Sequence, residues 1–84
     1  MTPEEQMDLL RIAARRAQDG SGRRIRQQNQ SPLSLVAAHC GTSIPAIQRW
    51  ETGQRRPRGL AGAKWALWCV TTEQKLRAES TAVA

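Results

Sequence analysis

Two groups of polar side chains in the middle of the chain have the chemistry needed to bind a nucleic acid. Gln48 and Arg49 are neighbours in a segment with helical periodicity. On the outer face of a helix, glutamine can bond to the edge of adenine and arginine to that of guanine, and each such pair gives about 1–3 kcal/mol of discrimination between bases. Three more arginines follow on a predicted loop, where their charge suits phosphate groups: Arg55, Arg56 and Arg58.

The candidate contact residues divide into those that reach bases and those that reach phosphates. The candidates for base contacts are Ile44, Pro45, Gln48 and Arg49. The candidates for phosphate contacts are Ser43, Thr52, Arg23, Arg24, Arg55, Arg56 and Arg58. A phosphate contact or a solvated side chain is the alternative for Gln48 and the arginines. Ile44 could instead pack inward, and Ser43 could serve only as a helix cap.

A helix from Ser43 to Thr52 is predicted to position the first group. Ser43 is suited to cap its start. Pro45 is tolerated in the first turn, where backbone N–H groups have no partner within the helix. Ile47 and Trp50 fall on one side of this helix, and Gln48 falls with its arginine neighbour on the other. A glycine follows and ends the helix.

Another helix is predicted directly before it, with Ser31 as cap and Pro32 at the first helical position. Its apolar face consists of Leu33, Val36, Ala37 and Cys40. Ala37 is small enough for the two helices to cross closely, and Gly41 can adopt positive φ in the turn between them. These features predict a helix-turn-helix, a motif that places its second helix in the major groove of DNA.

The flanking segments complete a compact all-α bundle of about five short helices with an additional N-terminal amphipathic helix. Thr2, Pro3 and Glu5 predict the start of that first helix. Its apolar stripe consists of Met7, Leu10, Ala14 and Ala17. Further helices are predicted over residues 23–29, 60–68 and 71–76. We therefore expect an N-terminal helix with a Gly/Ser hinge (1–22), a DNA-binding domain (23–77) and a frayed tail (78–84).

Basic charge is concentrated around the predicted helix-turn-helix. The net charge of the chain is +6. Residues 1–22 carry three arginines and four acids, a net −1, whereas residues 23–58 carry seven arginines and one acid, a net +6. Residues 59–84 carry three basic residues and two acids, a net +1. Charge confined to one segment indicates a polyanionic partner, with a solvated basic surface as the alternative.

The residue types argue against a metal site, a cofactor and catalysis. His39, Cys40 and Cys69 are too few and too scattered to hold zinc. Both cysteines have apolar neighbours, as expected for buried thiols of a cytoplasmic protein. The alternative is a disulfide bond between them. No paired carboxylates accompany the histidine and no glycine-rich phosphate loop is present, so we expect no enzyme. No apolar run is long enough to cross a membrane, and the acidic N-terminus does not fit a signal peptide.

The central segment resembles the Cro/CI-type family of helix-turn-helix proteins, also called XRE-like or lambda-repressor-like. The matching residues are Ala37, Gly41, Ser43, Ile47 and the run Trp50-Glu51-Thr52-Gly53-Gln54-Arg55-Arg56-Pro57. That run has the form of the family's W-E-x-G-x-R-x-P signature. The resemblance covers residues 23–67, about half of the chain.

This resemblance implies a protein that binds duplex DNA as a homodimer on an inverted repeat, without a cofactor. It also implies an ion pair between Arg26 and Glu51 that orients the recognition helix. The chain departs from the family at two positions. Leu33 stands where a phosphate-binding glutamine is common, and Gly22 stands where a large apolar residue is favoured.

The favoured function is a sequence-specific transcriptional regulator, most simply a Cro-like repressor of a phage or mobile element acting in the bacterial cytoplasm. One alternative is an antitoxin-like or adaptor protein whose main partner is another protein. This alternative is based on the N-terminal helix and on Trp65 and Trp68. The two tryptophans belong either to the core or to a protein interface. A further alternative is an excisionase-type accessory factor, which would need the same DNA contacts.

Overall fold

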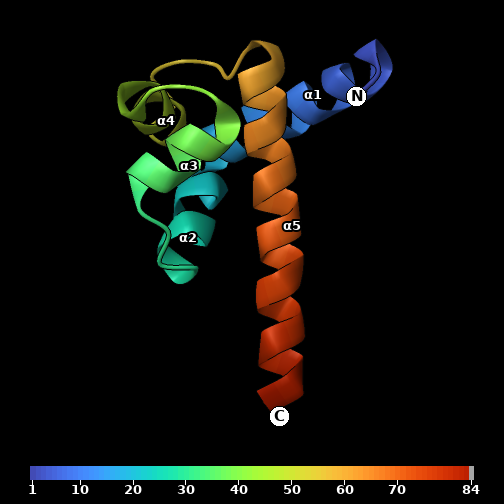
Figure 1. Cartoon of the computed structure of the whole chain (residues 1–84), viewed down its shortest axis with the longest axis vertical. Helices are drawn as coiled ribbons and strands as arrows, with labels where there is room; N and C mark the ends of the chain where they lie inside the picture. Colours follow the sequence, from blue (N-terminus) through green and yellow to red (C-terminus); the bar gives the residue numbers. More distant parts are fainter. Residues whose placement is uncertain (84) are drawn as a thin grey trace.

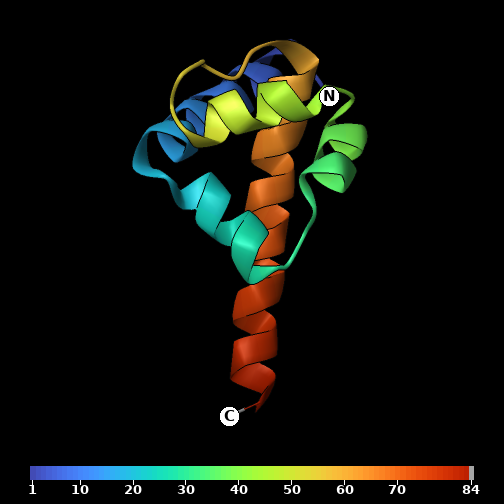
Figure 2. The ribbon, with the colours of Figure 1, turned by 90° about the vertical axis from the view of Figure 1, so that its left-hand side faces the viewer.

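The computed structural model describes residues 1–83, and this part of the chain forms five α-helices and no strand (Figure 1). The helices are α1 (Pro3–Asp19), α2 (Ser21–Gln28), α3 (Leu33–Cys40), α4 (Ile44–Glu51) and α5 (Gly59–Val83). The predicted all-α bundle is therefore confirmed. The four shorter helices gather around the first half of α5, whose last turns extend beyond them in both views (Figures 1 and 2).

The core lies where α1, α3 and α4 meet the first half of α5. Its buried residues are Ala13, Ala17, Val36, Ala37, Cys40, Ile47, Trp50, Trp65, Ala66 and Cys69. The indoles of Trp50 and Trp65 have centroids 5.6 Å apart and planes inclined by 52°, a tilted arrangement that aromatic pairs favour. Alanines let the helices approach closely, and Trp65 is the largest of the fully buried side chains among the described residues.

The first helix, α1, begins where its capping residues predict. The Thr2 side-chain oxygen accepts a hydrogen bond from the Glu5 N–H at 3.1 Å. Ala13 and Ala17 are buried, so the second half of α1 contributes to the common core. Met7, which the sequence predicts on the apolar stripe, is instead exposed. The reason is that the first turns of α1 project beyond α5 (Figure 1).

The second helix, α2, begins two residues before its predicted start, at Ser21. Its backbone N–H donates to Asp19 Oδ1 at 2.8 Å, and hydrogen bonding from Ser21 lowers the pKa of the Asp19 carboxyl. Gly22 is buried against the indole of Trp65, where a Cβ would lie 2.5 Å from Cζ2. Ser21 and Gly22 of the predicted Gly/Ser hinge therefore belong to the start of α2, and the chain turns between α1 and α2 at Gly20, which has a φ of 75°.

Helices α3 and α4 and the turn between them form the predicted helix-turn-helix geometry. Gly41 has a φ of 74°, and the Thr42 N–H donates to the Ala37 carbonyl at 2.9 Å to close the end of α3. The Ser43 hydroxyl caps α4 by accepting from the Ala46 N–H at 3.3 Å. The predicted cap at Ser31 is wrong, because α3 starts later and that hydroxyl accepts instead from the Asn29 side chain at 2.7 Å.

The last helix, α5, is continuous where the sequence predicts two helices and a frayed tail. Thr71 is expected to open a new helix, but its hydroxyl donates to the Leu67 carbonyl within α5. A threonine that bonds to its own helix in this way need not interrupt it. The helix continues to Val83, so residues 78–83 are helical, and residue 84 lies outside the described chain. Neither α5 nor any other described helix is long and apolar enough to cross a membrane.

Candidate nucleic-acid interface

The side chains of α4 separate into a buried set and an exposed set. Ile47, Trp50 and Glu51 are buried and fix the helix on the bundle. The exposed residues are Ile44, Pro45, Gln48 and Arg49, all four predicted to contact bases. Ile44 has 40% of its surface exposed, so it does not pack inward, which was the alternative predicted for it. The packing of Ile47, Trp50 and Glu51 on the bundle therefore leaves the predicted base-contact residues on the outer surface.

Gln48 and Arg49 line a groove between α2 and α4. Arg23 of α2 lines the same groove, as does Gln54 from the loop that follows α4. Arg24 lies elsewhere, and its charge contributes to the low pKa of the Asp19 carboxyl after the larger effect of hydrogen bonding from Ser21. The structure thus separates two arginines that are adjacent in sequence. Gln54 is a further candidate contact that sequence reasoning missed, although it lies inside the family motif.

The arginine-rich loop places three more guanidinium groups beside α4. Arg49, Arg55, Arg56 and Arg58 line one depression together with Ala46 and Trp50, and no acidic residue takes part in its lining. Pro57 is buried and anchors this loop to α5. It packs so closely on Gly62 that a Cβ there would lie 2.9 Å from the Pro57 carbonyl carbon. The loop therefore presents its charges from a fixed backbone.

An ion pair between Arg26 and Glu51 joins α2 to the buried side of α4, as the family resemblance implies. Arg26 Nε lies 2.5 Å from Glu51 Oε2, and Arg26 Nη2 lies 3.0 Å from Oε1. The remaining guanidinium nitrogen donates to the Ser31 carbonyl at 3.2 Å. Only 4% of the Glu51 side chain is exposed. Glu51 is the one acid between residues 23 and 58, and Arg26 takes it up. Among the described residues no carboxylate pairs with Arg49, Arg55, Arg56 or Arg58.

Two hydroxyl groups predicted to contact phosphates already bond within the protein. The Ser43 oxygen accepts from the Ala46 N–H, which leaves its own hydrogen free to donate outward. The Thr52 hydroxyl donates to the Gln48 carbonyl at 3.0 Å, so its hydrogen would have to leave that carbonyl to reach a phosphate. The geometry therefore favours Ser43 over Thr52 as a phosphate donor.

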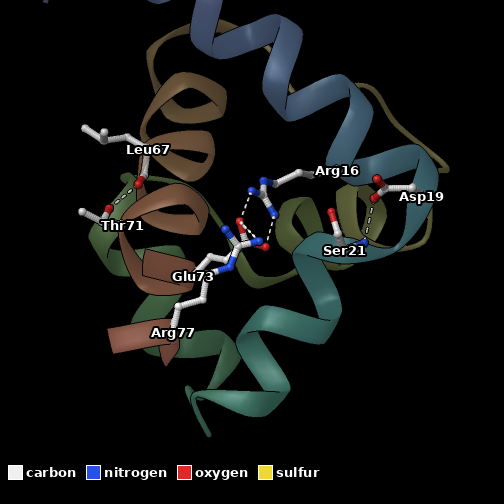
Figure 3. A network of polar contacts seen from close by, with 7 residues as sticks. All are labelled: Arg16, Asp19, Ser21, Leu67, Thr71, Glu73 and Arg77. Atoms are coloured by element: carbon white, nitrogen blue, oxygen red, sulfur yellow. Dashed lines mark hydrogen bonds and ion pairs between the residues drawn. The ribbon is translucent and has the colours of Figure 1, made fainter. Parts of the chain in front are cut away.

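A second ion pair, not predicted from the sequence, ties α1 to α5. Arg16 Nη2 lies 2.9 Å from Glu73 Oε1, and Arg77 lies 3.7 Å from the same oxygen (Figure 3). Hydrogen bonding from Arg16 holds the pKa of the Glu73 carboxyl below its usual value. The partners are 57 residues apart in sequence, so no local pattern could have revealed them. Arg16 therefore holds α1 against α5 through its ion pair with Glu73.

The tryptophans and cysteines belong mainly to the core. Trp65 is fully buried, whereas Trp68 is half-buried at the edge of the core beside Leu35. Both thiols are free, and burial raises the pKa of Cys40 to about 11 and that of Cys69 to about 12. Such thiols are poor nucleophiles at neutral pH. Residues 1–83 hold no cluster of three or more side chains suited to a metal ion.

Comparison of the chain with protein families, with curated proteins and with solved structures finds no match. The Cro/CI resemblance therefore rests on the motif residues themselves. Any functional conclusion must come from the chemistry of the surface around α4.

Proposed function

We propose that the protein is a sequence-specific transcriptional regulator that inserts α4 into the major groove of duplex DNA. The supporting observation is the combination on one exposed surface of Gln48 and Arg49 with the guanidinium groups around them. An amide and a guanidinium group on the same helix face supply both hydrogen-bonding patterns used to distinguish adenine and guanine. The surrounding arginines supply the sequence-independent attraction to phosphates.

The charge around α4 supports a polyanion as its partner. Arg55, Arg56 and Arg58 extend from an anchored loop on one side of α4, and Arg23 borders it on the other. A phosphate backbone flanks the major groove on both sides, so cations on both sides of one helix match that arrangement. The sole acid nearby, Glu51, is buried against Arg26 and does not offset this field.

The DNA sequence preference can be measured by selecting binding sites for the purified protein from a random duplex pool. We expect an enriched inverted repeat whose half-site centres lie about one helical turn apart, roughly 34–36 Å. The Arg49→Ala variant should select a motif that has lost information at one base pair. Arg15→Ala is the matched control, because it removes an exposed arginine from α1 without touching α4.

Lack of enrichment, with binding that disappears near physiological salt, would refute the proposal and favour a protein partner. The location of an enriched site separates the two DNA-binding roles. An operator that overlaps a promoter fits a repressor, whereas repeated sites beside a recombination site fit an excisionase-type factor.

A further inference from the structure

A second depression lies between the first turns of α1 and the arginine-rich loop, at the end of the molecule where α5 begins (Figures 1 and 2). We call it the α1 depression, and its volume is about 530 Å³. Its apolar residues are Met7, Leu10, Pro57 and Gly59, and its basic residues are Arg11, Arg56 and Arg58. None of the described acidic residues lines it. Cations in a hollow with apolar, low-dielectric walls focus the electric field, so the α1 depression attracts anions.

The α1 depression is continuous with the depression beside α4. Arg56 and Arg58 line both of them, whereas Arg49 lines only the one beside α4 and Arg11 only the α1 depression. The guanidinium groups therefore follow one path from the outer face of α4, across the loop, to α1. Pro57, which is buried, anchors the middle of this path. A DNA backbone carries closely spaced phosphates along a line, so it can follow such a path.

Arg11 is available for an outside contact although a carboxylate lies near it. Its Nη2 lies 3.7 Å from Asp8 Oδ1, and the two side chains are 77% and 71% exposed. An ion pair so open to solvent contributes little stability, so a phosphate can replace Asp8 as the partner. Glu4 and Glu5 lie on the first turn of α1, outside the lining of the depression. The anion is therefore expected beside Arg11 and away from the start of α1.

We propose that Arg11 binds a phosphate of duplex DNA, which makes α1 part of the DNA interface. This inference rests on the proposed function, because it extends the surface around α4 by one contact. The contact adds affinity for every duplex and reads no base. It gives a role to a helix that precedes residues 23–67, the segment that carries the family resemblance, so no motif residue implies it.

An acidic protein is the other class of partner that the charge of the α1 depression could attract. Duplex DNA is favoured because the same arginines continue without interruption to the outer face of α4. A protein that filled the α1 depression alone would leave the rest of that path unexplained.

The salt dependence of DNA binding tests the contact by Arg11. Fluorescence anisotropy of the full chain on one duplex, over a salt series, gives the slope of log affinity against log salt. Arg11→Ala should flatten this slope by about one, because one phosphate contact is lost. Arg11→Lys should restore it, since lysine binds phosphate as a point charge. Arg15→Ala is the matched control, because Arg15 is an exposed arginine one turn along α1 that lines neither depression.

Ethylation interference locates the contact on the DNA. Ethylation removes the charge of a single phosphate, so it weakens binding only where the protein uses that charge. The wild type should show one position of interference that disappears in Arg11→Ala, while the other positions stay. Circular dichroism checks that the variant keeps its helices.

Two results would overturn the contact by Arg11. One is a wild-type slope in Arg11→Ala when Arg55→Ala with Arg56→Ala does flatten it, and the other is an equal loss of slope in Arg15→Ala. Arg11→Ala that binds DNA like the wild type but loses affinity for poly-glutamate would assign the α1 depression to an acidic protein instead. The proposed function fails separately, because a protein that selects no DNA site can still lose salt dependence in Arg11→Ala.

Discussion

Gly22 of α2 packs directly against the indole of Trp65 in α5, and no side chain fits between them. A Cβ at position 22 would lie 2.5 Å from Cζ2 and 2.8 Å from Cη2 of the ring. The Cro/CI-type family favours a large apolar residue where Gly22 stands. In this protein the indole of Trp65, from another helix, takes the space that a side chain at position 22 would need.

We expect Gly22→Ala to lower the free energy of unfolding by about 1–3 kcal/mol, because the new methyl group overpacks a buried contact. Urea denaturation measures this loss. In a Trp65→Phe background the loss should shrink, since phenylalanine lacks the ring carbons that approach Gly22. Gln27→Ala, at an exposed site of the same helix, is the control. Equal losses in both backgrounds would show that the contact is not the cause.

The ion pair of Arg26 and Glu51 should contribute strongly to stability because it is buried. Glu51→Ala leaves the Arg26 guanidinium group without its carboxylate, which should cost about 3 kcal/mol. Thermal unfolding near pH 7 measures the effect, and Glu79→Ala provides an exposed control. A melting temperature within about a degree of the parent would contradict the importance of the pair.

The pair of Arg16 and Glu73 should make stability depend on pH in the acidic range. The pKa of Glu73 is lowered in the folded protein, so the pair stabilises the fold above the usual value of 4.5. That contribution is lost as the pH falls through the lowered folded pKa. Glu73→Gln should therefore destabilise the protein at about pH 7 and have less effect at about pH 2.5. A difference from wild type that stays constant across this range would exclude the mechanism.

Arg49 should read a base rather than only attract phosphates. Arg49→Ala should cost about 1–3 kcal/mol of discrimination at one base pair. It should leave the salt dependence of binding nearly unchanged. Affinity measured on a set of single-substituted operators at several salt concentrations separates the two effects. A uniform loss over all operators would mean that Arg49 does not read sequence.

Arg55 and Arg56 should act through charge alone. Removing both by Arg55→Ala and Arg56→Ala should weaken binding to every duplex and flatten the plot of log affinity against log salt by about two. Fluorescence anisotropy over a salt series measures this slope, with Arg15→Ala as the single-charge control. An unchanged slope would place these two arginines off the phosphate backbone.

The sequence by itself determined the helix-turn-helix and most of its helix ends. Thr2, Ser43 and Gly41 act through hydrogen bonds and backbone angles that span only a few residues. Such features are local, so they can be recognised without knowing the rest of the fold. The periodicity of α4 likewise separated Ile47 and Trp50 from Gln48 and Arg49 before any packing was known.

Local patterns failed where a residue's neighbours come from another helix. Gly22, which the sequence predicts as part of the Gly/Ser hinge, belongs to a helix start that packs against Trp65. The break predicted at Thr71 is absent for a different and local reason, because its hydroxyl bonds within α5. Met7 matched the apolar stripe of α1, but α5 does not extend far enough along that helix to cover it.

The tertiary structure decided which arginines form ion pairs within the protein and which face outward. Arg16 and Arg26 lie against carboxylates on helices distant in the sequence, whereas Arg23 borders the groove beside Arg49. Arg16 and Arg23 are arginines in similar helical settings, so local patterns could not distinguish their roles, whereas the family resemblance already implied the pair of Arg26 and Glu51. An ion pair depends on where two side chains meet in space, and the packing of α1 and α2 against α4 and α5 fixes that meeting.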